Sequence, residues 1–497
     1  MKRLVCMVLC TGVGLASAGL PAQPALADTL CVGGTNPGCF ASIQDAVDAA
    51  HDGDVIRVAP GTYAGGITID KSVELVGAGA GATTIEGGGP VITIGEFLGS
   101  TRLNVSISEL TISGGLTTSN LDSFVAEGGG VWIPLAAGNT SGATVTISKA
   151  LITGNRVAPS TALPLCGFLC AFASGGGIAN QGTLTVVGTR ITDNVAGSTA
   201  ADPSVASYAA AGGIWNGFEG TLTLRHSFVT ANRVAVSPPN GRNTDGGGIV
   251  SYRTLTIEDS VISDNSSDVT ASVTGSFPVD AAEANAGGLF LTPNSSTTIT
   301  GSRINENGVR ASNTAGDIQA ESGGIDSDGS LTLRGSSVEG NTVAGSVPAS
   351  SGFLAEADAG GIQVQGVTTV SDSRIGNNSL SATSPTGTAL GSGGGLFNLS
   401  ASLTMERTTV TANNASATGV GGFNLGGGIG NVQFGGGPPE LTLTDSVITA
   451  NRLTASAGIS SQGGGLYTAD PFSGTSFPVT LIRTVIAGNK PDQCVGC

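Results

Sequence analysis

Carboxylate side chains recur at fixed distances from a glycine pair in successive segments of this 497-residue chain. Three of them stand two residues before the pair and two stand four residues before it, so strand alternation places all five on one face. Oxygen ligands of this kind are what Ca²⁺ prefers, and the same stripe could hold a basic partner. The structural alternative is a solvated strand edge that deters association between sheets. The five residues are Asp245, Glu283, Glu321, Glu356 and Asp358.

Aromatic side chains recur at a second position, directly after the first inward-facing Ile, Leu or Val of each segment. In ten segments this position holds Trp132, Ala179, Trp215, Val250, Phe290, Asp326, Gln363, Phe397, Gly430 and Tyr467. Five of the ten are aromatic in a chain that is 4% aromatic, and both Trp residues are among them. Rings along a rigid face predict a platform for sugar rings or a protein partner, with Trp132, Trp215, Phe290, Phe397 and Tyr467 as its ligand-binding residues. The alternative is that loops cover the rings as a satellite core.

Cysteines fall in three close pairs once an N-terminal leader is set aside. Lys2 and Arg3, a following apolar run and Ala27 have the parts of a secretory signal peptide over residues 1–27. An oxidising compartment predicts local disulfides, although six Cys allow fifteen connectivities. The six candidates are Cys31, Cys39, Cys166, Cys170, Cys494 and Cys497.

The elements that position these residues repeat with a period of 33 to 42 residues. Each repeat has a Thr, an Ile or Val six residues later and an Asn three residues after that. The apolar residues alternate with polar ones, so each unit is a set of short strands, three to a turn. A solenoid follows, because such a unit buries its apolar side only against its neighbours. We therefore predict an all-β chain that folds as a right-handed parallel β-helix.

The ten Asn residues are predicted to form a structural ladder at one corner. Stacked coils place equivalent side chains directly above one another, about 4.8 Å apart. Amides at this spacing can bond to each other and to turn backbone that would otherwise be buried without partners. The ladder comprises Asn155, Asn194, Asn232, Asn265, Asn307, Asn341, Asn378, Asn413, Asn451 and Asn489.

The segment between each Asn and the next glycine pair is 11 to 21 residues long and alternates small with polar residues on both limbs. This pattern predicts an out-and-back β-arm, and arms that leave from one corner stack into a fin. Residues 42–50 have helical spacing behind the possible N-cap Ser42, so a short helix is expected to cover the N-terminal end. The predicted parts are the signal peptide at 1–27, the cap and first coils at 28–126, ten repeat coils at 127–489 and a Cys-containing tail at 490–497.

Three N-terminal stretches carry a resemblance to a known family. Residues 42–50, 52–63 and 67–77 resemble the cap and first coils of pectin-lyase-like right-handed β-helix proteins, and the later repeats resemble repeat-rich surface proteins of that superfamily. The resemblance implies a secreted β-helix. Its enzymes include pectate lyases, pectin methylesterases and polygalacturonases, which act on acidic polysaccharides through clustered Asp, Arg, Lys or His.

Those catalytic clusters are not evident in the sequence. The histidines are His51 and His226, and Gly-His-Gly, Asp-Asp and Arg-x-Lys do not occur after residue 27. A hydrolase needs a carboxylate pair and a lyase needs a base beside Ca²⁺, and scattered acids do not rule out the second. We therefore expect no catalysis and no required cofactor, with Ca²⁺ as a possible ligand.

Charge narrows the choice of partner. Removal of Lys2 and Arg3 leaves 18 basic against 36 acidic residues, a charge of −18, which disfavours nucleic acid. No later stretch is apolar enough to span a membrane. The expected protein is a monomeric extracellular or cell-surface β-helix that binds a polysaccharide or a surface protein. A polysaccharide lyase or hydrolase is the alternative. An ice-binding solenoid is a minor one, because Arg225, Glu258 and Arg334 interrupt the outward Thr columns.

Overall fold

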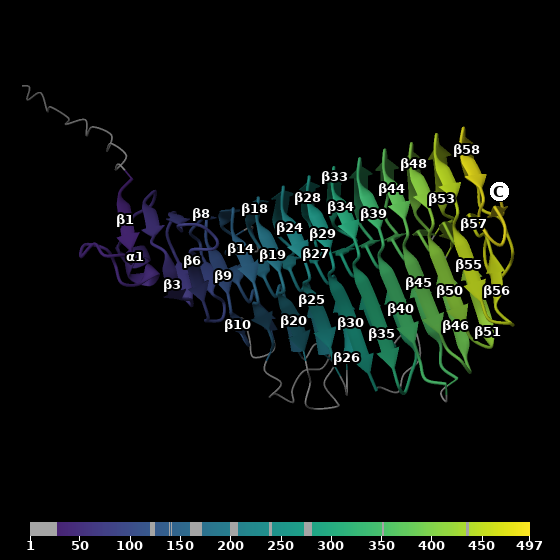
Figure 1. The fold of residues 1–497 in the computed structure, drawn as a ribbon, viewed down its shortest axis with the longest axis horizontal. Helices are drawn as coiled ribbons and strands as arrows, with labels where there is room; N and C mark the ends of the chain where they lie inside the picture. The colour runs from purple at the N-terminus through teal and green to yellow at the C-terminus, as the bar shows by residue number, and fades with distance from the viewer. Residues whose placement is uncertain are drawn as a thin grey trace, which may run out of the picture.

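A computed structural model describes residues 27–119, 125–138, 140, 142–159, 171–198, 207–237, 241–272, 281–349, 352–433 and 437–497. Figure 1 shows an elongated stack of coils with the N-terminal part at one end and the C-terminus at the other. All strand pairs between coils are parallel, and they form five long sheets, here named A to E. The predicted parallel β-helix is confirmed.

Three sheets enclose the main lobe of the coil. Sheet A contains β1 (Thr29–Val32), β2 (Val55–Val58), β5 (Glu74–Val76), β8 (Asn104–Ser108), β13 (Thr144–Ser148), β18 (Thr183–Val187), β23 (Thr221–Arg225), β28 (Thr254–Glu258), β33 (Ser296–Thr300), β38 (Ser330–Arg334), β43 (Thr368–Ser371), β48 (Ser402–Glu406), β53 (Glu440–Thr444) and β58 (Val479–Ile482). Sheet B contains β3 (Gly61–Ala64), β6 (Thr83–Glu86), β9 (Thr111–Ser113), β14 (Leu151–Thr153), β19 (Arg190–Thr192), β24 (Phe228–Thr230), β29 (Val261–Ser263), β34 (Arg303–Asn305), β39 (Ser337–Glu339), β44 (Arg374–Gly376), β49 (Thr409–Thr411), β54 (Val447–Thr449) and β59 (Val485–Ala487). Sheet C contains β4 (Ile67–Ile69), β7 (Ile92–Ile94), β12 (Val131–Ile133), β17 (Ile178–Asn180), β22 (Ile214–Asn216), β27 (Ile249–Ser251), β32 (Leu289–Leu291), β37 (Ile325–Ser327), β42 (Ile362–Val364), β47 (Leu396–Leu399), β52 (Ile429–Val432), β57 (Leu466–Thr468) and β60 (Cys494–Val495).

The predicted arms form the other two sheets. Sheet D holds the outgoing limbs: β10 (Leu116–Thr117), β15 (Arg156–Val157), β20 (Val195–Ser198), β25 (Arg233–Val236), β30 (Ser266–Ala271), β35 (Gly308–Asn313), β40 (Thr342–Ser346), β45 (Ser379–Thr383), β50 (Asn414–Thr418) and β55 (Arg452–Ala455). Sheet E holds the returning limbs: β11 (Val125–Glu127), β16 (Ala171–Ser174), β21 (Ser207–Ala210), β26 (Gly241–Asp245), β31 (Ala282–Asn285), β36 (Ile318–Glu321), β41 (Ala355–Asp358), β46 (Thr388–Ser392), β51 (Gly421–Leu425) and β56 (Ser460–Gln462). Each full coil therefore passes through sheets C, A, B, D and E in that order.

The two lobes have separate cores of different composition. Inside sheets A, B and C, large side chains such as Ile257, Ile262 and Leu289 are fully buried in one continuous cluster. Between sheets D and E the buried cluster consists mostly of Ala and Val, including Ala284 and Ala320. Small side chains allow two sheets to approach closely, so the fin is a thin double layer.

The Asn ladder stands at the neck between the lobes. Each Asn from Asn155 to Asn451 follows a strand of sheet B and precedes one of sheet D, and its Nδ2 donates to Oδ1 of the next Asn at 2.9 to 3.0 Å. Asn489 ends the ladder and donates to Gln493 Oε1 at 3.2 Å. Asn265 also donates to the carbonyl of Val229 at 2.9 Å. A glycine faces each Asn from across the neck, since a Cβ at Gly248 would lie 3.0 Å from Nδ2 of Asn265 and 2.7 Å from the Gly288 carbonyl.

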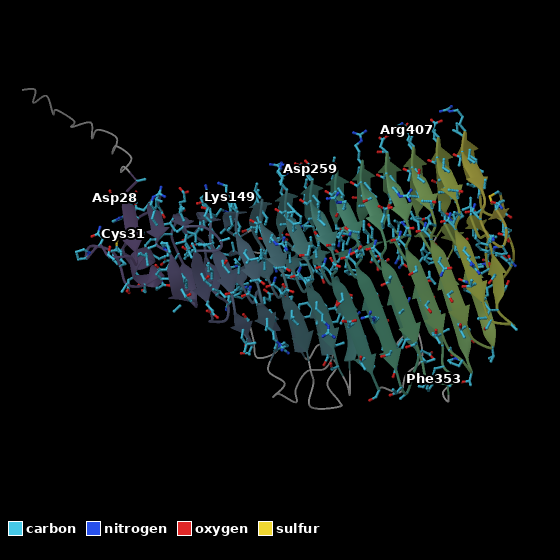
Figure 2. The ribbon with its side chains drawn as sticks, in the orientation of Figure 1. Asp28, Cys31, Lys149, Asp259, Phe353 and Arg407 are labelled. Carbon is cyan, nitrogen blue, oxygen red and sulfur yellow. A yellow bond between two sulfur atoms is a disulfide. The ribbon has the colours of Figure 1, made fainter. Side chains whose placement is uncertain are left out.

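The ends and the outer corner complete the solenoid. Helix α1 (Ile43–Ala49) begins at the N-cap Ser42, which accepts from the Asp45 amide, and it buries Ile43 and Val47 against the first coils. The predicted capping helix is confirmed. Figure 2 shows Lys149, Asp259 and Arg407 along one edge, the corner between sheets A and B.

Ion pairs link neighbouring coils at or beside this edge. They join Lys149 to Glu109, Arg225 to Glu258 and Arg407 to Asp372 at 3.1, 2.8 and 2.5 Å. His226 is exposed at this edge, and its Nδ1 lies 4.0 Å from Oδ2 of Asp259.

Disulfides join Cys31 to Cys39 and Cys494 to Cys497, with Cα atoms 4.7 and 6.1 Å apart. Cys166, Cys170 and the predicted signal peptide, apart from Ala27, lie outside the described residues. Within the described ranges, the chain contains no helix of the length and apolarity that a membrane span requires.

Candidate functional site

Sheets E and C meet at a sharp corner on the surface of the protein. Between the two strands of each coil one residue adopts a left-handed conformation, and four of these residues are not glycine. They are Ala211, Ala286, Ser322 and Ala359, with φ from 47° to 56°. The turn brings the outward side chains of sheet C against those of sheet E. We call this line of contact the C/E seam.

The predicted aromatic column lies at the bottom of this seam. Trp132, Trp215, Phe397 and Tyr467 are only 2% to 7% exposed, and Phe290 is half-buried. Two buried clusters contain them, one around Trp132 and Trp215 and one around Phe397 and Tyr467. The expected exposed platform is therefore corrected, because side chains of sheet E cover the outer face of sheet C. Alternation along a strand distinguishes its two faces, but it does not reveal that a second sheet covers one of them.

Exposed rings do rest on the buried column. Phe218 is 60% exposed, and its ring centroid lies 4.4 Å from that of Tyr252. The Trp215 ring packs edge-on against both, with centroid distances of 6.3 Å to Phe218 and 5.9 Å to Tyr252. Elsewhere Phe97 stacks on Trp132 at 6.5 Å. Phe97, Phe218 and Tyr252 lie in turns after sheet C, where no column of equivalent residues marks them in the sequence.

A pocket of about 380 Å³ opens beside the exposed ring of Phe218 and the half-buried ring of Tyr252. Its lining residues are Phe218, Glu219, Tyr252, Arg253, Thr292, Pro293 and Asn294. Arg253 Nε donates to the Phe218 carbonyl at 2.7 Å, and its Nη2 lies 3.4 Å from Glu219 Oε1. These bonds hold the turn that carries Phe218, so the rings and the polar groups beside them are ordered before any ligand arrives. We refer to this site as the ring pocket.

The five predicted acidic residues all lie along the middle of the C/E seam. Asp245 and Asp358 are buried, and Glu283, Glu321 and Glu356 are half-buried. Two further acids, Asp326 on β37 and Asp328 just after it, join them from sheet C. Asp326 occupies a position of the aromatic column, in register with Phe290 and Gln363, and the sequence does not show that this column lies against the acids of sheet E.

Hydrogen bonds connect these carboxyl groups to neutral donors. Asn285 donates to Asp245 Oδ1 at 3.0 Å, and the Tyr208 hydroxyl donates to Oδ2. Gln363 donates to Glu321 Oε2 at 3.0 Å, and Gln319 donates to Glu321 Oε1. Glu321 and Asp326, and likewise Glu356 and Asp358, are close enough for one negative charge to oppose the ionisation of the other group.

Burial raises the pKa of every acid in this group. It raises the pKa of Glu321 to about 8, with added repulsion from Glu356, and that of Glu283 to about 7. The pKa of Asp245 rises to about 6, and the pKa of Asp326 lies well above its usual range because burial and then Glu321 oppose its ionisation. Several of these groups therefore hold protons at neutral pH.

Some oxygens of the seam have no hydrogen-bond partner. Oδ1 of Asp326, Oδ1 of Asp358 and Oε1 of Gln363 belong to side chains that are 1%, 4% and 0% exposed, and each lacks a donor. Over the described ranges, no group of three or more His, Cys, Asp or Glu side chains is arranged to hold a metal ion. Oδ1 of Asp328, the Ser322 hydroxyl and the Trp215 indole N–H also lack partners, so both acceptors and donors are left unpaired in the seam.

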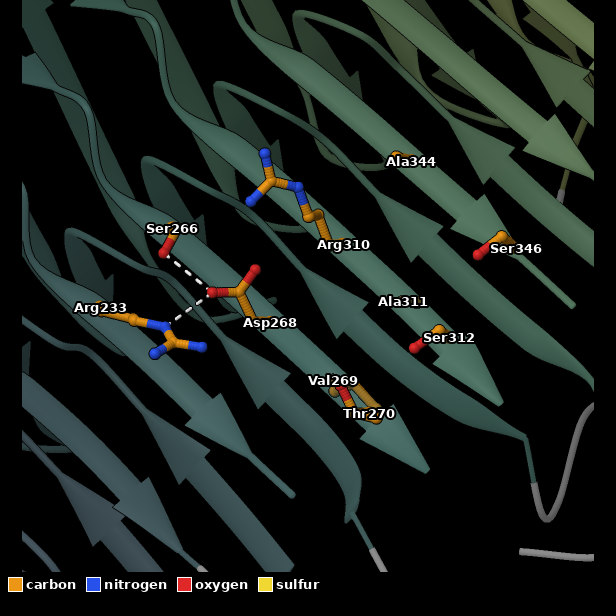
Figure 3. Close-up of a pocket in the computed structure, with 10 residues that line it drawn as sticks. All are labelled: Arg233, Ser266, Asp268, Val269, Thr270, Arg310, Ala311, Ser312, Ala344 and Ser346. Carbon is orange, nitrogen blue, oxygen red and sulfur yellow. Dashed lines mark hydrogen bonds and ion pairs between the residues drawn. The ribbon is translucent and has the colours of Figure 1, made fainter. Parts of the chain in front are cut away.

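A second pocket lies on the outer face of sheet D, with a volume of about 560 Å³. Figure 3 shows its lining on neighbouring strands, where Asp268 accepts from Arg233 at 2.8 Å and from Ser266 at 3.1 Å. The remaining lining is mostly Ala, Ser and Thr. Its lining contains no aromatic side chain, so it lacks the ring surface that the ring pocket provides.

Comparison with known proteins assigns no family to the chain. No family model matches it, and no curated protein matches it. Among solved structures, the A-module of the Azotobacter vinelandii mannuronan C-5 epimerase AlgE6 is 15% identical, with a TM-score of 0.35, over 90% of this chain and 94% of that one. The AlgE4 A-module from the same organism is 14% identical, with a TM-score of 0.34, over 84% and 92%. Similarity at this level assigns neither activity nor ligand. The fold and the seam define the chain as a parallel β-solenoid protein with a two-lobed coil.

Proposed function

We propose that this chain is a secreted, pectin-lyase-like β-helix protein that binds a glycan chain at the ring pocket and along the adjoining C/E seam, without catalysis. The disulfides at both ends of the described chain fit an oxidising extracellular location. The predicted signal peptide supports the same location. A surface protein that presents similar groups is an alternative occupant.

The observation that carries this proposal is the ring pair supported by Trp215, in which Phe218 is exposed and Tyr252 is half-buried. Aromatic faces provide apolar contact for sugar rings, with little loss of side-chain entropy on binding. Glu219, Arg253 and Asn294 stand beside the rings and can bond to sugar hydroxyls. Only Phe218 and Tyr252 need to remain accessible, so the burial of Trp215 is consistent with this role.

A glycan-array screen of the secreted protein, with and without Ca²⁺, tests the proposal. Combined Phe218→Ala and Tyr252→Ala substitution should reduce binding at least about tenfold. The exposed Phe218 ring contributes mainly to the complex, whereas loss of the half-buried Tyr252 ring also lowers the melting temperature, so binding is measured well below that temperature. Phe228→Ala is the matched control, since Phe228 is 40% exposed on the distant sheet B. Unchanged glycan binding by the double variant would contradict the ring pocket as the site.

A polysaccharide lyase or hydrolase is the second candidate, because buried carboxyl groups with a raised pKa are suited to acid and base chemistry. Glycosidases hold their two carboxyl groups about 5 to 9.5 Å apart. In the seam, Asp326 and Asp358 are only 1% and 4% exposed, which leaves little access for a glycosidic bond. Release of unsaturated or reducing-end product from a bound polysaccharide would establish the enzyme instead.

A further inference from the structure

A second exposed ring lies at the same corner of the coil as the ring pocket. Phe97 is 44% exposed, and its ring stacks on that of Trp132 with a centroid distance of 6.5 Å and an interplanar angle of 23°. Trp132 is only 7% exposed, and its indole N–H donates to Glu127 Oε2 at 3.2 Å. The buried Trp132 thus supports Phe97 as Trp215 supports Phe218. We refer to Phe97 and Trp132 as the second ring site.

Both ring sites belong to the turns that lead from sheet C to sheet A. Phe97 lies between β7 and β8, and Phe218 lies between β22 and β23. The Trp residues beneath them occupy one column of sheet C, in which Trp132 pairs with Ala179 and Ala179 pairs with Trp215. Two coil steps separate the two Trp residues, which is about 10 Å along the solenoid axis. The two ring sites are therefore offset along that axis.

Hydrogen bonds join the intervening turns into one surface. The Leu98 amide donates to the Leu135 carbonyl at 2.7 Å, and the Gly142 amide donates to the Gln181 carbonyl at 2.9 Å. The Gln181 side chain continues the line, since its Oε1 accepts from the Glu219 amide of the ring pocket at 3.4 Å. The spacing of the two ring sites is thus fixed before a ligand binds.

Surface charge at the two ring sites is balanced. The turn that carries Phe97 contains Glu96 and Arg102, and Arg102 Nη2 donates to Thr140 Oγ1 at 3.1 Å. In the ring pocket, Arg253 forms an ion pair with Glu219. Each site therefore presents one acid and one base, which favours a neutral sugar over a uronate or an amino sugar.

A ligand that contacts both ring sites must be an extended chain with apolar ring faces. Sugars whose hydroxyl groups are equatorial present C–H faces that pack on aromatic rings. A β-1,4 linkage between such sugars gives a straight chain, whereas the α-1,4 linkage of maltose-type glycans gives a curved one. The straight chain is the one that follows rings offset along the solenoid axis.

We propose that the second ring site and the ring pocket bind one and the same glycan chain, a neutral β-1,4-linked glycan that lies along the solenoid axis. This inference rests on the proposed glycan-binding function and specifies its substrate class and the direction of the chain. Once a chain is held at one site, its binding at the other is intramolecular, so affinity should rise steeply with chain length.

Isothermal titration calorimetry with oligomers of two lengths tests it. The oligomers are β-1,4-linked glucose and β-1,4-linked N-acetylglucosamine, each as dimer and hexamer, together with maltohexaose. In at least one β-1,4 series the hexamer should bind at least about tenfold more tightly than its dimer and than maltohexaose. Phe97→Ala should weaken binding of that hexamer at least about fivefold. Dimer binding should persist in this variant, because the ring pocket is intact.

Phe228→Ala is the matched control, since it removes a 40% exposed ring from sheet B, and it should bind the hexamer as the unmodified protein does. Thermal unfolding monitored by circular dichroism checks that each variant is folded. Phe97→Leu keeps apolar volume without a ring and replaces the alanine variant if that one is unfolded.

Two results would overturn the two-site inference and leave the proposed function intact: undiminished hexamer binding without the Phe97 ring, or equal affinities for dimer and hexamer. Tighter binding of maltohexaose than of both β-1,4 hexamers would overturn the assigned linkage. If none of these oligomers binds while the glycan array detects another glycan, this inference fails and the proposed function stands. If the array is also negative, both proposals fail.

Discussion

Buried polar side chains in this protein divide into those with all partners present and those without. The Asn ladder belongs to the first kind, since each inner amide donates to a neighbouring Asn and to a main-chain carbonyl. The acids in the middle of the C/E seam belong to the second kind, since Oδ1 of Asp326, of Asp328 and of Asp358 lacks a hydrogen-bond partner. Stability depends on the first set, and we expect its pH dependence to come from the second.

The first prediction concerns pH. The pKa of Glu321 is raised by burial from 4.5 to about 8, so the folded chain keeps a proton that the unfolded chain has released across this window. The free energy of unfolding therefore falls as pH rises from about 4.5 to about 8. Glu321→Gln should flatten this fall and raise the melting temperature at pH 8 by at least about 2 °C. Calorimetry at pH 5 and pH 8 measures both effects, and parallel pH profiles for the two proteins would contradict the assignment.

The second prediction concerns the ladder. Asn265→Leu leaves the amide of Asn232 and the carbonyl of Val229 without their bonds in a buried neck. We expect destabilisation by more than about 3 kcal/mol, because each orphaned buried group costs about 1 to 3 kcal/mol. Asn104→Leu, at an exposed position on sheet A, is the control and should change stability little. Denaturant unfolding compares them, and equal midpoints would show that the ladder bonds contribute no net stability.

Among the elements, those with a repeated pattern were the ones predictable from sequence. The strands, the two limbs of the arms, the capping helix and the position of the Asn residues follow from alternation and spacing, because stacking converts a column in sequence into a column in space. The burial of Trp215 and the proximity of Asp326 to Glu321 depend on the angle between sheets C and E. That angle is produced by left-handed residues such as Ser322, which carry no clear signal when they are not glycine.

The third prediction tests this corner. Ala286 has φ of 47°, a conformation that costs an L-residue energy, so Ala286→Gly should be neutral or stabilise by up to about 1 kcal/mol. Gly288→Ala should destabilise strongly, since the new Cβ would lie 2.5 Å from the Gly324 carbonyl. The opposite signs are measured by thermal unfolding of the two variants. Destabilisation by both would mean that the methyl group of Ala286 contributes packing that outweighs its strain.

As a whole, the molecule is a stack in which each coil contacts mainly the coil before and the coil after it. The sheets run in the same order through the repeated region, and the polar ladder continues from Asn155 to Asn489. Stability in such a stack is approximately a sum over coils and their interfaces.

The fourth prediction follows from this stacking. Deletion of residues 414–451 removes one repeat and leaves Asn413 directly before Arg452, where Asn451 stood. Residues 411–413 and residues 449–451 both read Thr-Ala-Asn, so the sequence before Arg452 is the same after the deletion as before it. The shortened protein should fold and unfold cooperatively, as seen by circular dichroism. Deletion of residues 414–432 alone breaks the order of the sheets and should yield an unfolded product; if both products fold equally well, stacking is less specific than the ladder indicates.

The polar neck also has a consequence for how such a protein can diversify. Because the Asn and glycine columns separate the two cores, an arm can lengthen, shorten or change its tip without a compensating change in the main lobe. The segments between Asn and glycine pair vary from 11 to 21 residues, while the spacing from Thr to Asn is constant. The main lobe of sheets A, B and C can thus stay constant during evolution while the length and chemistry of the arms change independently in each coil.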